Sequence, residues 1–374
     1  MIEKSRDIVY NLTMGNIDYL TNVRRALHKI PELSEREFKT SEFIANELSR
    51  MKHKFRKYGT GVVCDVKGYD SSATVALRCD IDALPITEKS DCPFKADSGN
   101  MHACGHDGHT AMLLCVAEML TRRRPKTDVR LVFQFGEEGD GGAEKMLDMG
   151  ALEGVDEIFA FHLCPELEIG KVASTDGAMF AGTAEFDVSF IGKSCHCANV
   201  SDGNDALKAA VTFYSKSAEC NADRARNTVF HIGKLEGGTA RNIVADSAKA
   251  YCTLRYFDRA DLDAVMMRIE NRLVETDNLF GTEHKVLVNA VYPPLVNNPA
   301  SLAKVRKIAD VLECEPRFTA EDFAFYLQKI PGCMLWLGCR DDKHTSPLHS
   351  DTFGFDETAL LTGVEIYEKL IFDR

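Results

Sequence analysis

Three apolar runs of this sequence carry side chains that are able to bind a metal ion. Asp80 and Asp82 follow the first run, in LRCDIDALP. Glu137 and Glu138 follow the second run, in FQFGEEGDGG, and His162 lies in the third, FAFHLCPE. Parallel α/β sheets bind ligands at the carboxyl ends of their strands. We therefore expect these three groups to meet at one edge of a sheet.

A fourth group of such side chains lies between the first two runs, in MHACGHDGHTAM. Three histidines, a cysteine and an aspartate occur there within eight residues: His102, Cys104, His106, Asp107 and His109. So many ligand types in one short loop that leads into a helix favour a metal site over a purely structural role. Far downstream, SPLHSD adds the imidazole of His349.

Each of these groups, taken alone, has a simpler structural interpretation. An Asp-x-Asp pair after a strand is often a turn or a helix cap. A single histidine such as His162 or His349 is more often a hydrogen-bonded core residue than a ligand. Two adjacent glutamates are usually solvated, but Glu137 and Glu138 follow a buried apolar run. Two ionised carboxylates are costly there unless a cation neutralises them.

Together the groups offer enough carboxylate, imidazole and thiolate for two divalent cations about 3.5–4 Å apart. Such a pair of cations polarises a carbonyl oxygen and lowers the pKa of a water that lies between them. A carboxylate beside that water can then take its proton. The adjacent Glu137 and Glu138 suit this division, because one can bind metal while the other acts as general base.

Composition excludes several other classes of function. The 374 residues include 45 Lys and Arg against 57 Asp and Glu, a formal net charge of −12. This charge argues against nucleic acid and anionic membrane surfaces as partners. The apolar stretch 111–120 is interrupted by Glu118 and is shorter than the roughly 20 residues that span a bilayer. The charged first residues do not resemble a secretory signal, and the 13 cysteines have no disulfide-like spacing, so we expect a cytoplasmic protein.

The order of the expected elements predicts an α/β fold. Apolar residues at helical spacing predict helices over 17–30 and 35–50. Short apolar runs then alternate with helical patterns at 107–120 and 142–149, as in a mostly parallel sheet flanked by helices. The runs are ATVALRCD, VRLVFQFG and EIFAFHL.

From about residue 182 the pattern changes to strands that alternate apolar and polar residues, with helices over 205–220 and 260–274. This pattern predicts a smaller α+β domain with an antiparallel sheet and two helices. We therefore expect residues 1–181 and 292–374 to form one domain, which carries the metal site, and residues 182–291 to form a second domain inserted into it.

With these residues assembled, the chain resembles a family of zinc- or manganese-dependent amidohydrolases and metallopeptidases. The family includes aminoacylases, hippurate hydrolases, N-acetyldiaminopimelate deacetylases and plant indole-acetyl-amino-acid hydrolases. The similarity covers essentially the whole chain. The matching segments, in order, are RRALHKIPELSEREFKTSEFI, ALRCDIDALPITE, NMHACGHDGHTAMLL, FQFGEEGDGGAEKMLDMGAL, GGTARNIVADSA, AEDFAFYLQKIPG and PLHSDTFGFDETAL.

The resemblance implies roles for individual residues. Five are implied as ligands of two divalent metal ions, which would be zinc or manganese, with cobalt or nickel as alternatives: Cys104, His106, Glu138, His162 and His349. Glu137 matches the general base, Asp80 matches an active-site aspartate, and Asp82 is expected to orient a ligand. In the inserted domain, His196 matches a histidine that approaches the substrate carbonyl, and Asn242 matches a residue placed to bind substrate.

The implied activity is hydrolysis of the amide bond of an N-acyl amino acid by a water that the two metals share. A dipeptidase or carboxypeptidase of the same family is the alternative, and a binding protein that has lost turnover is a further one. The inserted domain is implied to act as a lid and to form a homodimer, in which His196 can serve the opposite subunit.

The sequence departs from the family pattern in two places. A usual Pro-His pair after the lid histidine is absent, because Cys197 and then Asn199, Val200 and Ser201 follow His196. This departure bears on which substrate is preferred. Phe135 and Gly136 replace a usual proline and alanine before the paired glutamates, which bears on the geometry of that loop.

Overall fold

The computed structural model describes residues 17–221 and 228–372. These residues form two compact units. The first contains the described residues up to Gly177, Val296–Glu315 and the residues from Phe325 onward. The second contains Ala178–Leu295 and Pro316–Ala324. The catalytic role expected for 1–181 with 292–374, and the lid role expected for 182–291, stay predictions.

The first unit is built on an eight-stranded sheet. Its four central strands, β4, β3, β5 and β14, are parallel to one another, whereas β1, β2 and β6 add antiparallel pairs nearer its edges. The predicted α/β class is therefore confirmed, with a sheet that is parallel at its centre and mixed overall. In spatial order the strands are β1 (Phe55–Tyr58), β2 (Gly61–Val66), β4 (Asp128–Gln134), β3 (Thr74–Asp80), β5 (Glu157–Glu168), β14 (Gly332–Arg340), β6 (Val172–Ser174) and β13 (Val311–Glu313).

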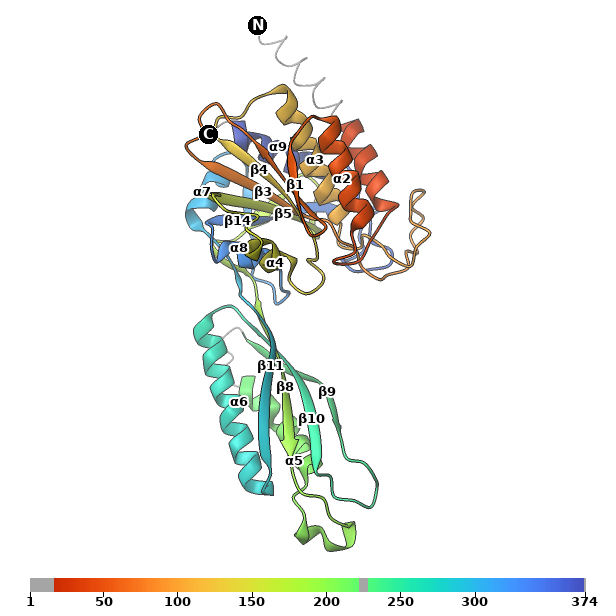
Figure 1. Cartoon of the computed structure of the whole chain (residues 1–374), viewed down its shortest axis with the longest axis vertical. Helices are drawn as coiled ribbons and strands as arrows, with labels where there is room; N and C mark the ends of the chain where they lie inside the picture. Colours follow the sequence, from red (N-terminus) through yellow and green to blue (C-terminus); the bar gives the residue numbers. More distant parts are fainter. Residues whose placement is uncertain (1–16, 222–227, 373–374) are drawn as a thin grey trace. The chain divides into compact units, whose positions relative to one another are not determined.

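Helices cover both faces of this sheet (Figure 1). The connection from β3 to β4 and the one from β4 to β5 cross the sheet in opposite directions. Because such crossovers are right-handed, their helices α3 and α4 lie on opposite faces. The helices of the unit are a helix over 17–28, α2 (Phe38–Arg50), α3 (His106–Arg122), α4 (Gly142–Asp148), α7 (Pro299–Arg306) and α9 (Ala359–Phe372).

The helix α3 lies inside the core of the first unit. Residues 111–117 are all buried, so this helix is covered around its whole circumference. It packs against α9 and β3. A helix enclosed in this way holds its first turn, which begins at His106, in a fixed position relative to the ends of the central strands.

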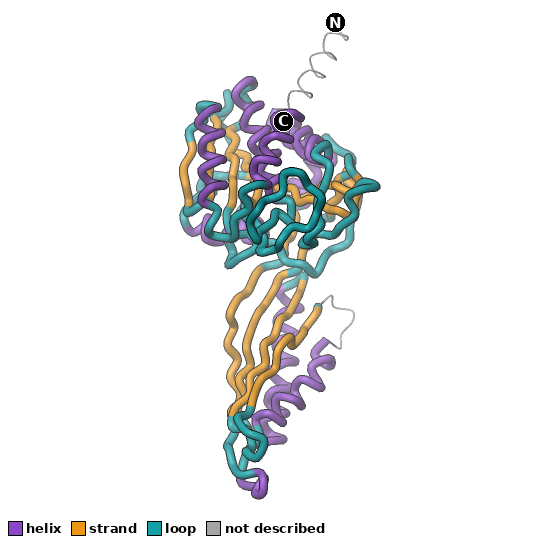
Figure 2. The backbone as a smooth tube through the Cα atoms, turned by 90° about the vertical axis from the view of Figure 1, so that its right-hand side faces the viewer, coloured by secondary structure: helices purple, strands orange, loops and turns teal. Residues whose placement is uncertain are grey.

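The second unit is a four-stranded antiparallel sheet with α5 and α6 on the same face (Figure 2). On β10, alternate side chains from Ala248 to Tyr256 are buried against these helices, as the alternating pattern predicted. The predicted α+β unit is confirmed. Its elements are β8 (Gly182–Ile191), η1 (Cys197–Asp202), α5 (Ala206–Lys216), η2 (Ser217–Asn221), β9 (Val229–Gly237), β10 (Ser247–Tyr256), α6 (Arg259–Phe280) and β11 (Glu283–Tyr292).

Three short elements include residues at or next to the unit boundaries: β7 (Gly177–Phe180), β12 (Leu295–Asn297) and α8 (Phe323–Leu327). Among the described residues, none of the helices combines the length and apolar character needed to cross a membrane.

Candidate metal centre

The thiol of Cys104 lies at the centre of the candidate site. Its Sγ is 3.3 Å from Nε2 of His162 and 3.3 Å from Nε2 of His349. The ligand atoms of Cys104, His106 and His162 all lie within 4.8 Å of one another, and so do those of Cys104, Glu138 and His349. The structure therefore brings together all five residues that the resemblance implied as metal ligands.

The strand ends explain how residues so far apart in sequence meet. The parallel register places Asp80, the last residue of β3, opposite Gln134, the last residue of β4. The loops that carry Asp82 and the paired glutamates therefore leave the sheet side by side. His162 lies on the next strand, β5, which pairs with the other side of β3. The prediction of one shared sheet edge is borne out by this topology.

His349 is held beside Cys104 by its own backbone. Its φ of 62° lies in the left-handed region, which is unusual for a residue other than glycine. Its N–H donates to the carbonyl oxygen of Ala103 at 2.9 Å. A strained backbone that is fixed in this way often marks a functional position, and here it keeps the imidazole next to the thiol.

His106 presents one ring nitrogen to the site and the other to Asp82. The distance from Nδ1 to Oδ1 of Asp82 is 3.1 Å. The buried Nε2 has no hydrogen-bond partner among the described residues, while carboxylate oxygens of Asp80 and Glu137 lie 3.7 and 3.9 Å away. Burial alone would lower the pKa of His106, but the carboxylates of Asp80 and Asp82 outweigh it and raise the pKa to about 10.

Asp82 connects three parts of the site. In addition to His106, it accepts a hydrogen bond from the backbone N–H of Glu138 at 2.9 Å and one from the hydroxyl of Ser34 at 2.7 Å. Its pKa is lowered, because these bonds and the His106 charge outweigh the opposing effect of burial. One carboxylate thus fixes both the ring of His106 and the loop of the paired glutamates.

The glutamate loop depends on glycines at two positions. Gly136 has φ +66°, and its N–H donates to Glu37 at 2.9 Å. A Cβ at Gly142 would lie 1.7 Å from the carbonyl oxygen of Phe135, so no larger residue fits there without moving the backbone. Gly136, which replaces a residue usual in the family, thus has a left-handed backbone conformation that glycine adopts easily.

Asp80 contacts a different set of side chains. One of its oxygens accepts from Arg78 at 2.9 Å, and the other lies 2.6 Å from Nδ1 of His109. Arg78 is fully buried and also donates to Gln134 at 2.8 Å. Burial opposes ionisation of Asp80, but the charges on His106 and Arg78 and the hydrogen bond from His109 hold its pKa well below the usual value.

The donor set fits divalent transition-metal ions. It contains one thiol, three imidazoles and nearby carboxylates, the ligands that such ions take in proteins. Burial, with help from the carboxylates of Glu138 and Glu137, raises the pKa of the Cys104 thiol well above its usual value. Bound cations would neutralise the neighbouring carboxylates, and the lone pair of His106 Nε2 could coordinate one of them. They would also stabilise the thiolate form of Cys104.

A layer of charged side chains behind this cluster was not predicted from the sequence. Asp107 does not join the ligands. It lies 2.9 Å from Nε of Arg24 and 2.8 Å from Nδ1 of His28, and His28 also contacts Glu88 at 3.1 Å. Arg24 and His28 are spaced one helical turn apart in RRALHKIPE, on the face that also buries Leu20 and Leu27. Charged residues on an apolar helix face were the signal that could have revealed them.

His102 is also left outside the ligand set. It is buried, and neither ring nitrogen has a hydrogen-bond partner among the described residues. Burial lowers its pKa to about 4, so the ring is neutral near pH 7.

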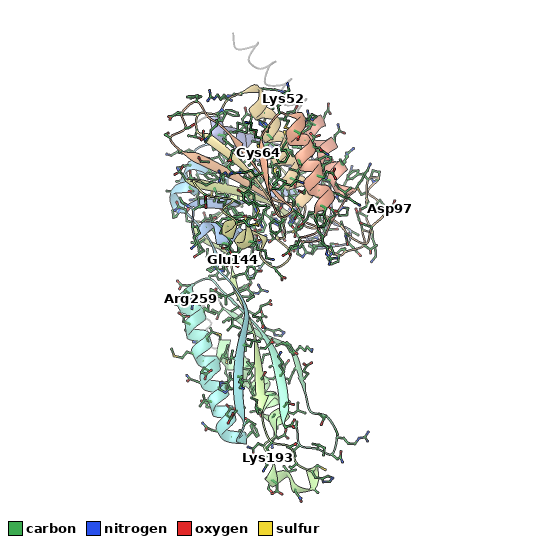
Figure 3. All side chains as sticks on the ribbon, in the orientation of Figure 1. Lys52, Cys64, Asp97, Glu144, Lys193 and Arg259 are labelled. Atoms are coloured by element: carbon green, nitrogen blue, oxygen red, sulfur yellow. The ribbon has the colours of Figure 1, made fainter. Side chains whose placement is uncertain are left out.

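His196 and Asn242 belong to the second unit and lie next to each other there. His196 forms a bridge with Ile243, and the N–H of Cys197 donates to the carbonyl oxygen of Asn242 at 2.9 Å. Lys193, which precedes this segment, lies at the end of the unit opposite Arg259 (Figure 3). The structure thus places the two predicted substrate-binding residues on adjacent segments of the second unit.

Residues 76–373 match the model of peptidase family M20/M25/M40. The chain belongs to this family. Its M20 membership confirms the resemblance found in the sequence, and it makes this chain a metal-dependent amidohydrolase.

Similar proteins align with nearly the whole of this chain. An N-acetyldiaminopimelate deacetylase of Bacillus subtilis is 35% identical over 94% of this chain and 97% of its own length. The crystal structure of a Bacillus subtilis protein, described as a dinuclear metal-binding peptidase from the M20 family, superposes with a TM-score of 0.85. It is 32% identical and covers 96% of this chain and 98% of its own. A second N-acetyldiaminopimelate deacetylase, from Lactococcus lactis, is 33% identical over 92% of this chain and 96% of its own length.

Proposed function

We propose that this chain hydrolyses the amide bond of N-acyl amino acids, releasing a carboxylate and a free amino acid. The observation that carries the proposal is the convergence of Cys104, His162 and His349 beside the adjacent Glu137 and Glu138. The deacetylase relatives, which align over nearly the whole chain, support the substrate class. N-acetylated amino acids, diaminopimelate among them, are therefore the first substrates to test.

In this proposal five residues hold two divalent cations, zinc or manganese: Cys104, His106, Glu138, His162 and His349. When bound, such cations polarise the amide carbonyl and make a nearby water more acidic. Asp82 keeps the Nε2 of His106 directed at the site and holds the Glu138 backbone. This support matters because partners behind a metal-binding histidine fix its ring orientation.

Glu137 then moves the protons. Its carboxylate takes a proton from the attacking water, so that the water oxygen forms a bond to the carbonyl carbon. It gives that proton to the amide nitrogen as the carbon–nitrogen bond breaks. The side chain of Glu137 is 11% exposed, which limits exchange of this proton with bulk water.

Two residues of the second unit are proposed to complete the substrate site. His196 would donate to the oxygen on which negative charge develops, and Asn242 would bind the amino-acid part. The segments that carry them lie side by side, which supports a shared role. We also propose that two chains pair through this unit, because its edge strand β11 exposes the apolar side chains of Leu287, Val288 and Val291.

The substrate class is tested with purified protein that has been reconstituted with zinc or manganese. We expect release of free amino acid from N-acetyl and N-benzoyl amino acids, detected by chromatographic separation of the products. Dipeptides serve as the comparison, because a structurally similar M20 protein is described as a peptidase. Faster cleavage of dipeptides than of every N-acyl amino acid would replace the amidase proposal with the peptidase one.

A second test concerns the thiol of Cys104. We expect metal-free protein to be alkylated slowly at Cys104, and metal-loaded protein to be protected, because a bound cation occupies the sulfur. Peptide mass mapping after iodoacetamide treatment measures this difference. The exposed Cys197 is an internal control and should react equally in both samples. Equal labelling of Cys104 with and without metal would contradict its role as a ligand.

A further inference from the structure

We propose that His109 is a positioning residue, which sets the ring of His162 through the backbone N–H and C=O of Leu163. The inference rests on the proposed role of His162 as a metal ligand. Nothing in the proposed mechanism uses His109, although it is buried in the same histidine-rich segment. Its ring lies 4.9 Å from that of His162, centroid to centroid.

The hydrogen bonds of His109 define where its ring carries a proton. The backbone N–H of Leu163 donates to Nε2 of His109 at 3.0 Å. An amide N–H can only donate, so Nε2 must be the accepting nitrogen and the proton must lie on Nδ1. That Nδ1–H faces Oδ1 of Asp80 at 2.6 Å. Asp80 thus selects the tautomer of His109, and Arg78 holds Asp80 from its other oxygen at 2.9 Å.

The backbone carbonyl of the same residue, Leu163, fixes the ring of His162. The carbonyl oxygen of Leu163 lies 2.9 Å from Nδ1 of His162. A carbonyl can only accept, so Nδ1 of His162 carries the proton and its Nε2 keeps a lone pair. That Nε2 points at Cys104, 3.3 Å from the sulfur. The sequence of contacts therefore runs from Asp80 to His109, and then along the backbone of Leu163, from its N–H to its C=O, to His162.

The same contacts argue against His109 as a ligand. Ligand atoms of Asp80, His106 and His109 lie within 4.8 Å of one another, as they would around a cation. However, a cation at Nε2 would displace the Leu163 N–H, and one at Nδ1 would displace the proton shared with Asp80. A buried N–H left without an acceptor is destabilising. His109 is thus a supporting partner. Such partners usually contact the metal ligand directly, whereas His109 acts through the backbone of Leu163.

Two substitutions separate this role from a purely structural one. In His109→Gln the amide oxygen can reach the position of Nε2 and accept from Leu163, but the donor to Asp80 is lost. In His109→Asn the amide nitrogen can replace Nδ1 and donate to Asp80, but Leu163 loses its acceptor. We expect the Asn variant to bind zinc about 10–100-fold more weakly than wild type, and the Gln variant to stay closer to wild type. Competition with a chromophoric chelator measures both affinities.

A structural role as the partner of Asp80 predicts the opposite order, with the Asn variant closer to wild type, and that order would overturn the proposal. Nitrogen NMR of metal-free protein labelled at histidine provides a readout independent of activity. We expect the Nδ1–H tautomer for both His109 and His162 in wild type. An Nε2–H tautomer at His109 would also overturn the proposal.

His162→Asn distinguishes this inference from the proposed function. Loss of one bound zinc in that variant supports the ligand role on which the inference rests. If His162→Asn binds two zinc ions as tightly as wild type, the ligand assignment is wrong and the proposed function fails. The tautomer of His109 would then still test its hydrogen bond with the Leu163 N–H. However, His109 could no longer be a positioning residue for a metal ligand.

Discussion

Replacing Glu137 with glutamine is expected to lower kcat on an N-acetyl amino acid by about 10²–10⁴-fold, the usual contribution of a general base. Glutamine keeps the size of the side chain but cannot take a proton at neutral pH. The metal content should stay near that of wild type, because the five proposed ligands do not include Glu137. Steady-state kinetics and metal analysis of the same preparation provide the two measurements.

Glu144→Gln is the matched control for this substitution. Glu144 lies on α4, shortly after the paired glutamates, and its side chain is exposed. Figure 3 shows it at the surface of the first unit. The control removes the same charge from the same region and should leave kcat unchanged. Full activity of Glu137→Gln would rule out the base, whereas loss of metal from this variant would make Glu137 a ligand.

The sequence pattern predicted the elements that position the site. Runs at 73–80 and 129–136 became β3 and β4, and the helical pattern from residue 107 became α3. These elements are fixed by local periodicity, which is visible in a single sequence. The α6 helix was less predictable: it continues past Val274 to Phe280 and ends where Gly281 adopts φ 65°. Its last turns are polar enough to hide the periodicity, although Thr276 is buried.

The charged layer behind the site was not predictable in the same way. Arg78, Gln134 and Asp80 are brought together by the pairing of β3 with β4. Asp107 and Arg24 are separated by 83 residues, and no spacing rule connects them. Ligand types can be recognised from their chemistry, but the partners that orient them are chosen by tertiary contacts. His109 illustrates this limit, since its role depends on a peptide on β5.

Asp107→Ala is expected to destabilise the protein by about 3–5 kcal/mol, the usual cost of removing one partner of a buried ion pair. The side chain of Asp107 is fully buried, and that of Arg24 is 4% exposed. Without Asp107, the ion pair that Arg24 keeps is a longer contact of 3.3 Å to Glu357, and His28 loses its partner at Nδ1. Urea unfolding of metal-free protein, followed by circular dichroism, measures the change.

An exposed pair of the same residue types is the control. Arg259 and Asp263 form an ion pair one helical turn apart on α6, and their side chains are 74% and 60% exposed. Asp263→Ala should cost less than about 1 kcal/mol, because exposed pairs contribute little. If Asp107→Ala cost no more than this control, the buried network would not contribute to the stability of the fold.

The pH dependence of this difference follows from the ionisation of Asp107. Burial alone would raise the pKa of Asp107, but Arg24 and His28 outweigh burial and hold the pKa well below its usual value. A carboxyl whose pKa is depressed by folding stabilises the folded state above its unfolded pKa, about 3.9. That stabilisation disappears only as the pH falls through the folded pKa. Wild type and Asp107→Ala should therefore differ fully at pH 7 and should begin to converge only below about pH 4. Convergence already between pH 7 and pH 5 would show that the stabilisation comes from another group.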